Sequence, residues 1–237
     1  RASSRRAPKA TRVFQTHKRE QASDMASPRP QPASPFREDC LSGLAVLVTG
    51  GATGIGLGIS ESFAAHGARL LIVGRRADVL ESSCAALRKR WPSCHATAFR
   101  ADVRDADSCA AAVAACVATH KRLDALVNCA AGNFMCAAED LTAKAFRTVV
   151  DIDLQGTYNM SAAALQALSV SSAPRERPAT AGGPVVINIS ATLQYRALPF
   201  QAHASAAKAG IDSLTKTLGL EYGAEHGVRV VGIAPGP

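Results

Sequence analysis

A cluster of glycines between an apolar run and a helix-like stretch is the first place in this sequence that could do chemistry. The residues Thr49-Gly50-Gly51-Ala52-Thr53-Gly54-Ile55-Gly56 follow the apolar run 45–48. Glycines at these intervals permit a tight turn, close approach of the backbone to a pyrophosphate, and close packing of a helix on a strand. The N–H groups that open the helix favour an anion. We expect a dinucleotide to bind at Gly50, Thr53, Gly54, Ile55 and Gly56, with a plain turn as the alternative.

Two arginines follow the second apolar run. At this place, dinucleotide-binding proteins that select NAD carry an acid for the ribose hydroxyl. This sequence reads Gly74-Arg75-Arg76 there, and guanidinium groups offer paired donors and positive charge to a 2′-phosphate. We therefore expect NADP(H), with two solvated arginines at a helix start as the alternative. Asp102, after the third run, is placed to meet the adenine. Asn128, after the fourth run, should lie near the rest of the nucleotide.

The framework for these residues is an alternation of short apolar runs with longer helix-like stretches. We expect strands at 45–48, 69–73, 96–101, 125–128, 185–189 and 228–233. We expect helices at 55–65, 79–90, 108–120, 144–168 and 204–222. Continuous apolar strands indicate a sheet that is covered on both faces, so the pattern predicts an α/β fold with a doubly wound parallel sheet of the Rossmann type. Residues 169–183 are polar and contain proline, which predicts an exposed loop.

Most of the excess positive charge lies near the N-terminus. The formal net charge of the 237 residues is +8, and seven Lys or Arg against two acids give residues 1–24 a net charge of +5. Basicity confined to a tail does not favour a nucleic-acid partner, and we expect none. No apolar run approaches the roughly 20 residues that a membrane-spanning helix needs, so we expect no membrane span.

The composition predicts a disordered basic extension at 1–40, ahead of one domain at 41–237. The extension is rich in Arg, Ser, Ala and Pro and shows no sustained apolar period. Its first nineteen residues contain no acid, as in a mitochondrial presequence, although the sequence starts at Arg1 and Met25 is an alternative start. The seven cysteines have no Cys-x-x-Cys spacing, so we expect reduced thiols and no metal site.

Taken together, four features resemble the short-chain dehydrogenase/reductase family over about 41–237. They are the glycine pattern, the run Asn128-Cys129-Ala130-Ala131-Gly132, Lys208, and Pro235-Gly236-Pro237 after the last predicted strand. The resemblance implies that Lys208 binds the nicotinamide ribose. It also implies cofactor contacts at Pro235 and Gly236.

The sequence departs from the family's common Ser-Tyr-Lys set. The places of the serine and the tyrosine hold Ala191 and Ala204. One branch of the family, the 2,4-dienoyl-CoA reductases, is similar in the places of departure, and the run 128–134 resembles theirs. Its mitochondrial members have a tyrosine shortly after the fifth strand, where this sequence has Leu193 and then Tyr195. Its peroxisomal members lack that tyrosine and carry the acid that corresponds to Asp153.

This resemblance implies NADPH-dependent reduction of 2,4-dienoyl-CoA to 3-enoyl-CoA in peroxisomal β-oxidation. Such a reduction needs no phenol donor, because hydride reaches the far carbon of the diene, negative charge moves to the thioester oxygen, and the proton goes to carbon. The Asn133 amide can donate to that oxygen. By resemblance, Asp153 pairs with Lys208 and supplies the proton through a water. The catalytic set is therefore Asp153, Lys208 and Asn133, and the expected substrate contacts are Asn133, Phe134 and Arg75.

Several alternatives stay open. Tyr195 is a second candidate acid if its loop folds inward, and His203 is a helix-start residue that could act as a base. A different enoyl-type reductase, or a non-catalytic NADP-binding remnant, would carry the same glycine pattern. The sequence ends directly after the sixth expected strand, so we expect the family's final strand and substrate helices to be missing. The resemblance further implies a homo-oligomer, commonly a tetramer, and a peroxisomal location, with the mitochondrion as the alternative.

Overall fold

The computed structural model describes residues 34–170 and 182–236. The greater part of the predicted N-terminal extension, 1–33, and most of the predicted loop, 171–181, lie outside the described residues. The remaining residues from Arg37 onward form one compact unit. The described residues include every predicted site residue, from Gly50 to Gly236.

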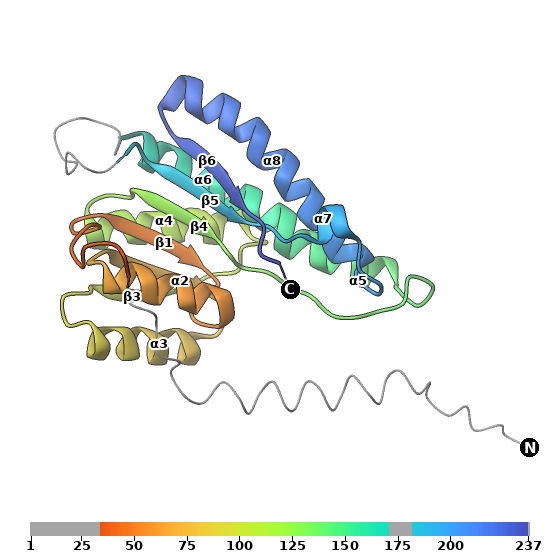
Figure 1. Cartoon of the computed structure of the whole chain (residues 1–237), viewed down its shortest axis with the longest axis horizontal. Helices are drawn as coiled ribbons and strands as arrows, with labels where there is room; N and C mark the ends of the chain where they lie inside the picture. Colours follow the sequence, from red (N-terminus) through yellow and green to blue (C-terminus); the bar gives the residue numbers. More distant parts are fainter. Residues whose placement is uncertain (1–33, 171–181, 237) are drawn as a thin grey trace, which may run out of the picture. The chain divides into compact units, whose positions relative to one another are not determined.

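Six parallel strands form one sheet, in the order β3-β2-β1-β4-β5-β6 (Figure 1). The chain crosses over once, from β3 to β4, so the two halves of the sheet are wound in opposite directions from β1. The strands are β1 (Ala45–Thr49), β2 (Arg69–Gly74), β3 (Ala96–Arg100), β4 (Ala125–Asn128), β5 (Val185–Ile189) and β6 (Arg229–Ile233). The predicted doubly wound parallel sheet is confirmed.

Helices cover both faces of the sheet around its central strands, whereas the edge strand β6 is largely exposed. The first face packs against α2 (Gly54–Ala65) and α3 (Ala77–Arg90), and the second against α4 (Ala106–His120), α6 (Gly156–Val170) and α8 (Ala202–His226). The core lies between the layers: Leu70 and Ile72 of β2 point toward the first face, whereas Leu71 and Val73 point toward the second. Period-two alternation of buried apolar residues on both faces explains why the strands read as continuous apolar runs.

The long helix predicted at 144–168 is interrupted. The structure has α5 (Ala143–Val150), a π-helical turn η2 (Asp151–Gln155) and then α6. A π turn inserts one extra residue into the helical repeat, which a continuous apolar period does not reveal. The short helix α7 (Leu193–Arg196) was not predicted either, and α8 extends further at both ends than the predicted 204–222.

The glycine loop between β1 and α2 has the backbone that the sequence predicts. Gly50 and Gly54 have φ angles of +66° and +54°, in the left-handed region that favours glycine. A Cβ atom on Gly56 would lie 2.2 Å from the carbonyl oxygen of Gly50. The missing side chain of Gly56 thus lets α2 begin directly against the turn that leaves β1.

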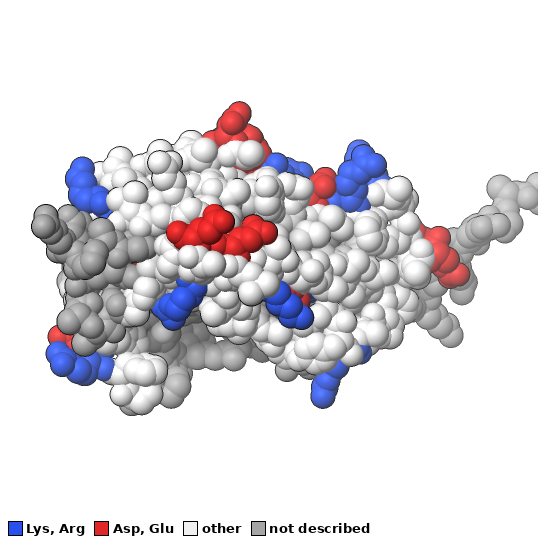
Figure 2. All heavy atoms as spheres, turned by 90° about the horizontal axis from the view of Figure 1, so that it is seen from above, with Lys and Arg blue, Asp and Glu red and all other residues white. Residues whose placement is uncertain are grey.

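The charged side chains and the cysteines of the described residues are distributed as follows. On the face shown in Figure 2, Lys and Arg side chains are separated by uncharged residues. Within 34–170 and 182–236, no helix is both long and apolar enough to cross a membrane. Four of the seven free cysteines, Cys84, Cys94, Cys109 and Cys116, are buried in the core, as predicted for core thiols.

Replacing Gly56 by alanine should destabilise the fold by roughly 2 kcal/mol or more, because the new Cβ meets backbone that cannot move aside. The measurement is the free energy of unfolding in urea. Gly58→Ala is the matched control on the same helix, since a Cβ there meets nothing within 4 Å. Equal stability of the two variants would contradict the close approach of α2 to Gly50.

Candidate active site

A cavity of about 460 Å³ opens at the carboxyl ends of the strands, where parallel sheets of this topology bind ligands. It runs from the glycine loop past the ends of β2 and β3 to η2 and α8. Ten of the predicted site residues line it: Gly50, Thr53, Ile55, Gly56, Arg75, Arg76, Asp102, Asn133, Asp153 and Lys208. The fold therefore brings together residues that lie up to 158 positions apart in the sequence.

Five predicted residues do not line the cavity. Gly54 lies between two that do, at the first position of α2. Pro235 and Gly236 follow β6, and the Pro235 carbonyl accepts a hydrogen bond from the Thr192 N–H at 3.1 Å. The other two, Asn128 and Phe134, have side chains engaged elsewhere in the protein.

Asn128 is buried at the end of β4, and its side chain joins neighbouring elements. Its Nδ2 donates to Ser161 Oγ in α6 at 3.0 Å and to Asn188 Oδ1 in β5 at 2.9 Å. Asn128 is the last residue of β4, as predicted, and its side chain is turned into the protein. Asn128 therefore joins β4 to α6 and β5.

The end of the cavity at α2 is suited to phosphate. Thr53, which precedes the helix, makes no side-chain capping hydrogen bond, and the first turn contains no acid. The backbone N–H groups of that turn are consequently available, and the positive end of the helix dipole faces the same way. No Cβ would meet an atom within 4 Å at Gly54, so the backbone is open to close approach.

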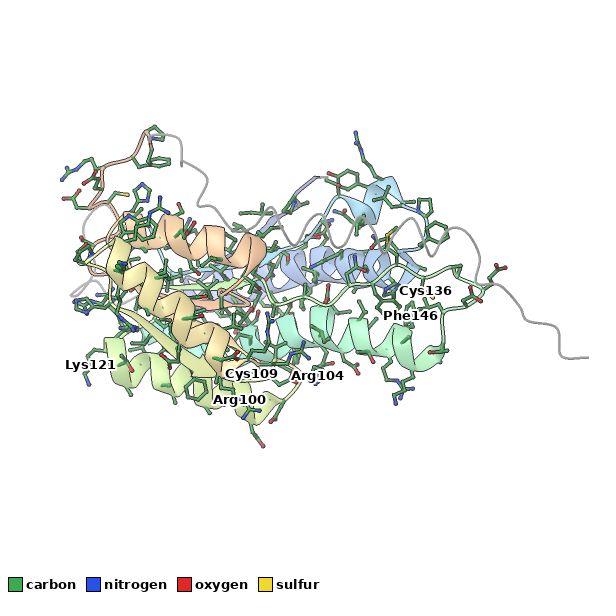
Figure 3. The ribbon with its side chains drawn as sticks, turned by 90° about the horizontal axis from the view of Figure 1, so that it is seen from below. Arg100, Arg104, Cys109, Lys121, Cys136 and Phe146 are labelled. Carbon is green, nitrogen blue, oxygen red and sulfur yellow. The ribbon has the colours of Figure 1, made fainter. Side chains whose placement is uncertain are left out.

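Positive charge surrounds the end of the cavity at β2 and β3. Arg75 and Arg76 line it, and Arg100 at the end of β3 donates from Nε to the Arg75 carbonyl at 3.2 Å. Asp102, which also lines the cavity at this end, pairs with Arg104, which holds the pKa of that carboxyl below its usual value. Figure 3 shows Arg100 and Arg104 on the same side of the molecule. The local charge is therefore positive, as the arginine pair predicts.

Asp153 lies in the π turn η2 and is 1% exposed. Its neighbours in the turn pack where glycine leaves space: a Cβ on Gly132 would lie 2.9 Å from Ile152, and one on Gly210 would lie 2.7 Å from Leu154. The turn is thus held closely between the segment after β4 and α8. Single π turns inside α-helices are frequent at functional sites.

The Asp153 carboxylate has two partners. Its Oδ1 accepts from the Gly132 N–H at 2.7 Å, and its Oδ2 lies 3.3 Å from Lys208 Nζ. Lys208, also buried, donates from Nζ to the Ile189 carbonyl at the end of β5, at 3.0 Å. Burial raises the pKa of Asp153 above its usual value, although the Lys208 charge and the Gly132 N–H oppose that rise. The carboxyl therefore keeps a proton at higher pH than an exposed aspartate does.

The segment after β4 is fastened to the start of α8. Asn133 donates from Nδ2 to Gln201 Oε1 at 2.6 Å. The ring of Phe134 stacks on that of His203, with the centroids 4.3 Å apart. Phe134 is 37% exposed and His203 is fully buried, so the phenyl ring covers the imidazole. His203 therefore lies inside α8 as a packed residue at the edge of the site.

The family's usual hydroxyl groups are absent from the described cavity lining. Ala191 and Ala204 both line it, where the common Ser-Tyr-Lys set would place serine and tyrosine. Leu193 lines the cavity as well, whereas Tyr195 in α7 is 66% exposed and does not. Asp153 and Lys208 line the same cavity as these two alanines.

Comparison with known proteins agrees with this geometry. Residues 44–237 match the short chain dehydrogenase family. The chain belongs to that family. It is 47% identical to the peroxisomal 2,4-dienoyl-CoA reductase of Arabidopsis thaliana over 204 residues, which cover 86% of this chain and 67% of the relative. It is 38% identical to the rat protein of the same name over 205 residues, covering 85% of this chain and 65% of that one.

Two further matches are bacterial proteins. The probable 2,4-dienoyl-CoA reductase of Bacillus subtilis, named as producing a (2E)-enoyl-CoA, is 35% identical over 81% of this chain and 72% of its own length. A short chain dehydrogenase structure from Bacillus anthracis is 35% identical with a TM-score of 0.74, covering 82% of this chain and 76% of that one. The chain thus spans about two thirds of the length of the curated peroxisomal relatives reported above.

Sequence reasoning missed several residues of the site. Ser190 is buried, and its Oγ donates to the Lys208 carbonyl at 3.4 Å, one position before the alanine that was considered. Cys129 lines the cavity, but burial raises the pKa of its thiol, which disfavours a nucleophilic thiolate. The adjacency of Cys129 to Asn128 was the only sequence signal for the thiol. Gln201 carried no sequence signal, because its partner is 68 positions away.

Removing the lysine charge should raise the pKa of Asp153 further. Lys208 favours the ionised carboxylate, so Lys208→Met leaves burial with less opposition. The measurement is the carboxyl ¹³C chemical shift of labelled aspartate as a function of pH, in protein shown to be folded by circular dichroism. Lys216→Met, an exposed position on the same helix, is the control. An unchanged or lowered pKa in Lys208→Met would contradict the pairing.

Proposed function

We propose that this protein is an NADPH-dependent reductase that converts 2,4-dienoyl-CoA to 3-enoyl-CoA. The observation that carries the proposal is the buried Asp153, whose carboxyl group lies 3.3 Å from Lys208 Nζ in a cavity whose usual tyrosine position is Ala204. The peroxisomal relatives are named as (3E)-enoyl-CoA-producing dienoyl-CoA reductases, which supports the same substrate class.

The proposed reaction requires a proton on carbon and no proton on oxygen in the product. A product double bond between C3 and C4 requires one new hydrogen at C5 and one at C2. When bound, the nicotinamide cofactor supplies the hydride for C5, and its two electrons move negative charge through the diene to the thioester oxygen. The protein then supplies the proton that C2 takes up. Atoms and charge balance with one dienoyl-CoA, one NADPH and one proton consumed.

The residues of the cavity fit a dinucleotide. Its phosphates would bind the open N-terminus of α2 at Thr53, Gly54 and Ile55, where no capping side chain or acid competes. Lys208, held by the Ile189 carbonyl, would bind the nicotinamide ribose. Arg75 and Arg76 would bind a 2′-phosphate, because forked guanidinium donors match its oxygens and no acid in the described residues pairs with either.

Asp153 is the proposed proton donor, acting through a water. Its burial keeps the carboxyl protonated at higher pH, and Lys208 then stabilises the carboxylate that remains after transfer. Asn133 is the proposed donor to the thioester oxygen, since one of its two amide hydrogens is used by Gln201 and the other is not. Phe134, partly exposed beside Asn133, is the proposed contact for the acyl chain.

Location and partners follow from the same proposal. Acyl-CoA is the proposed partner and β-oxidation of unsaturated fatty acids the proposed process. The peroxisomal names of the relatives favour the peroxisome over the mitochondrion, for which none of the reported relatives argues. A homo-oligomer remains part of the proposal by family resemblance.

A second candidate function is the reductase type that yields a 2-enoyl product. The Bacillus subtilis relative is named for that product, and it is 35% identical. The two reactions differ in where the proton is added, so the position of the product double bond separates them. Proton NMR of the product formed in deuterated water decides between C2 and C4.

Asp153→Asn should lower kcat for 2,4-dienoyl-CoA by about a hundredfold, because an amide cannot supply the proton. In the full-length protein, turnover should fall as pH rises through the raised pKa of Asp153, since the donor is the protonated form. The assay follows NADPH absorbance across the pH range. Asp151→Asn, in the same turn but outside the cavity lining, is the control and should keep the wild-type profile. Full activity in Asp153→Asn would overturn the role of this carboxyl.

Arg75→Ala with Arg76→Ala should weaken NADPH binding by roughly a hundredfold and change NADH binding much less, because only NADPH carries the 2′-phosphate. Isothermal titration with each cofactor measures the two affinities. Arg147→Ala, an exposed arginine on α5, controls for loss of general positive charge. Equal losses for NADPH and NADH would contradict recognition of the 2′-phosphate.

A further inference from the structure

The side chain of Gln201 forms a hydrogen bond to a residue that is distant in the sequence. It occupies the residue before the first turn of α8, where side chains commonly cap the helix, but it makes no capping hydrogen bond. Its Oε1 instead accepts from Asn133 Nδ2 at 2.6 Å, across 68 positions of sequence. The Gln201 side chain therefore makes no capping hydrogen bond to its own helix. It instead holds Asn133, which lines the cavity.

Two neighbouring contacts also hold the segment after β4 against the start of α8. The Cys136 N–H donates to the Phe200 carbonyl at 3.0 Å, and Phe134 stacks on His203. Phe200 has a φ of +67°, in a region that a bulky residue adopts only when its surroundings hold it there. Figure 3 shows Cys136 at the same end of the molecule as Phe146 of α5. Residues 133–136 are thus fastened to 200–203 at three points.

In this structure the nitrogen of the Asn133 amide faces Gln201. An asparagine side chain can turn its oxygen or its nitrogen toward a ligand, and only the nitrogen stabilises negative charge on oxygen. With Gln201 Oε1 as its acceptor, Asn133 directs its NH₂ group to that side, and its second N–H is not used by this bond. The next residue back, Gly132, donates its N–H to Asp153. One short segment therefore carries both the oxyanion donor and a contact to the proposed acid.

We propose that Gln201 is a positioning residue that orients the Asn133 amide toward the thioester oxygen of the substrate. The proposal rests on the proposed reductase function and on the role given there to Asn133. In the free protein the bond lies near solvent, so it contributes little to stability. Once bound substrate excludes water, the same bond gains in strength and keeps the donor in place while charge develops on the oxygen.

The test is a double-mutant cycle on the full-length protein. Gln201→Met keeps the length of the side chain and removes the acceptor, and it is measured alone and in an Asn133→Ala background. We expect Gln201→Met alone to lower kcat roughly tenfold, with the Kd of NADPH and the melting temperature unchanged. In the Asn133→Ala background the same substitution should have no further effect, because the group it orients is gone. Gln166→Met, on the exposed side of α6, is the matched control.

The outcomes separate this inference from the function on which it rests. Equal losses of kcat in the two backgrounds would show that Gln201 acts elsewhere, and would overturn the inference while leaving the reductase in place. A loss in Gln201→Met that is matched by weaker NADPH binding or a lower melting temperature would make its role structural and overturn it as well. A wild-type protein that binds NADPH without reducing 2,4-dienoyl-CoA would overturn the function and, with it, this role.

Discussion

The arrangement of the cavity depends on one buried ion pair. Asp153 and Lys208 meet at 3.3 Å with side chains that are 1% and 11% exposed. Removing ionisable groups from water is costly, and the cost is offset only when each has further polar partners. Asp153 has the Gly132 N–H, and Lys208 has the Ile189 carbonyl. The pair therefore links the segment after β4, the π turn, α8 and the end of β5 at a single point.

The surrounding backbone is shaped to admit this pair. The π turn directs Asp153 inward. Glycines on two other segments leave space for the side chains on either side of Asp153. A third glycine, Gly156, follows the turn, and a Cβ on it would lie 2.5 Å from Val103. Small residues at these contacts let η2 pack more closely than an ordinary helix would. The same closeness excludes water from the carboxyl and so raises its pKa.

A carboxyl of this kind suits the chemistry proposed for the site. Where hydride transfer places negative charge directly on a carbonyl oxygen that must be protonated, a hydroxyl donor at that oxygen is an advantage. In conjugate reduction the charge spreads to a thioester oxygen that only needs hydrogen bonds, and the proton is required at carbon. An amide donor and a buried acid divide these tasks between them. The alanines at 191 and 204 are then compatible with an enzyme, since neither task calls for a hydroxyl.

Much of the fold could be predicted from the sequence, because the strands are short, largely apolar runs, and the central ones are buried on both faces. The six predicted strands agree with the structure to within one residue at each end. The glycine loop could be predicted because backbone turns and close approaches restrict the residue type. Asn128 was predicted at the right strand end, but its bonds to Ser161 and Asn188 could not be predicted, since an amide can face a cavity or a buried neighbour equally well.

The structural details on which the chemistry depends were harder to predict from the sequence. The π turn at Asp151–Gln155 keeps the apolar period of a helix, and only its extra residue rotates Asp153 inward. The bond between Asn133 and Gln201 depends on two segments that meet only after the sheet has formed. Local sequence patterns report on neighbours within a few positions, and these contacts join residues that are far apart.

The central claim is that Asp153 retains its proton at a pH where exposed aspartates have lost theirs. Infrared difference spectra of wild type against Asp153→Asn, recorded across a pH titration, observe that proton directly through the carboxylic acid carbonyl band. The account predicts a protonated carboxyl band that is absent from the variant and persists above the pH at which the exposed aspartates ionise. A difference spectrum in which this carboxyl ionises together with the exposed aspartates would contradict it.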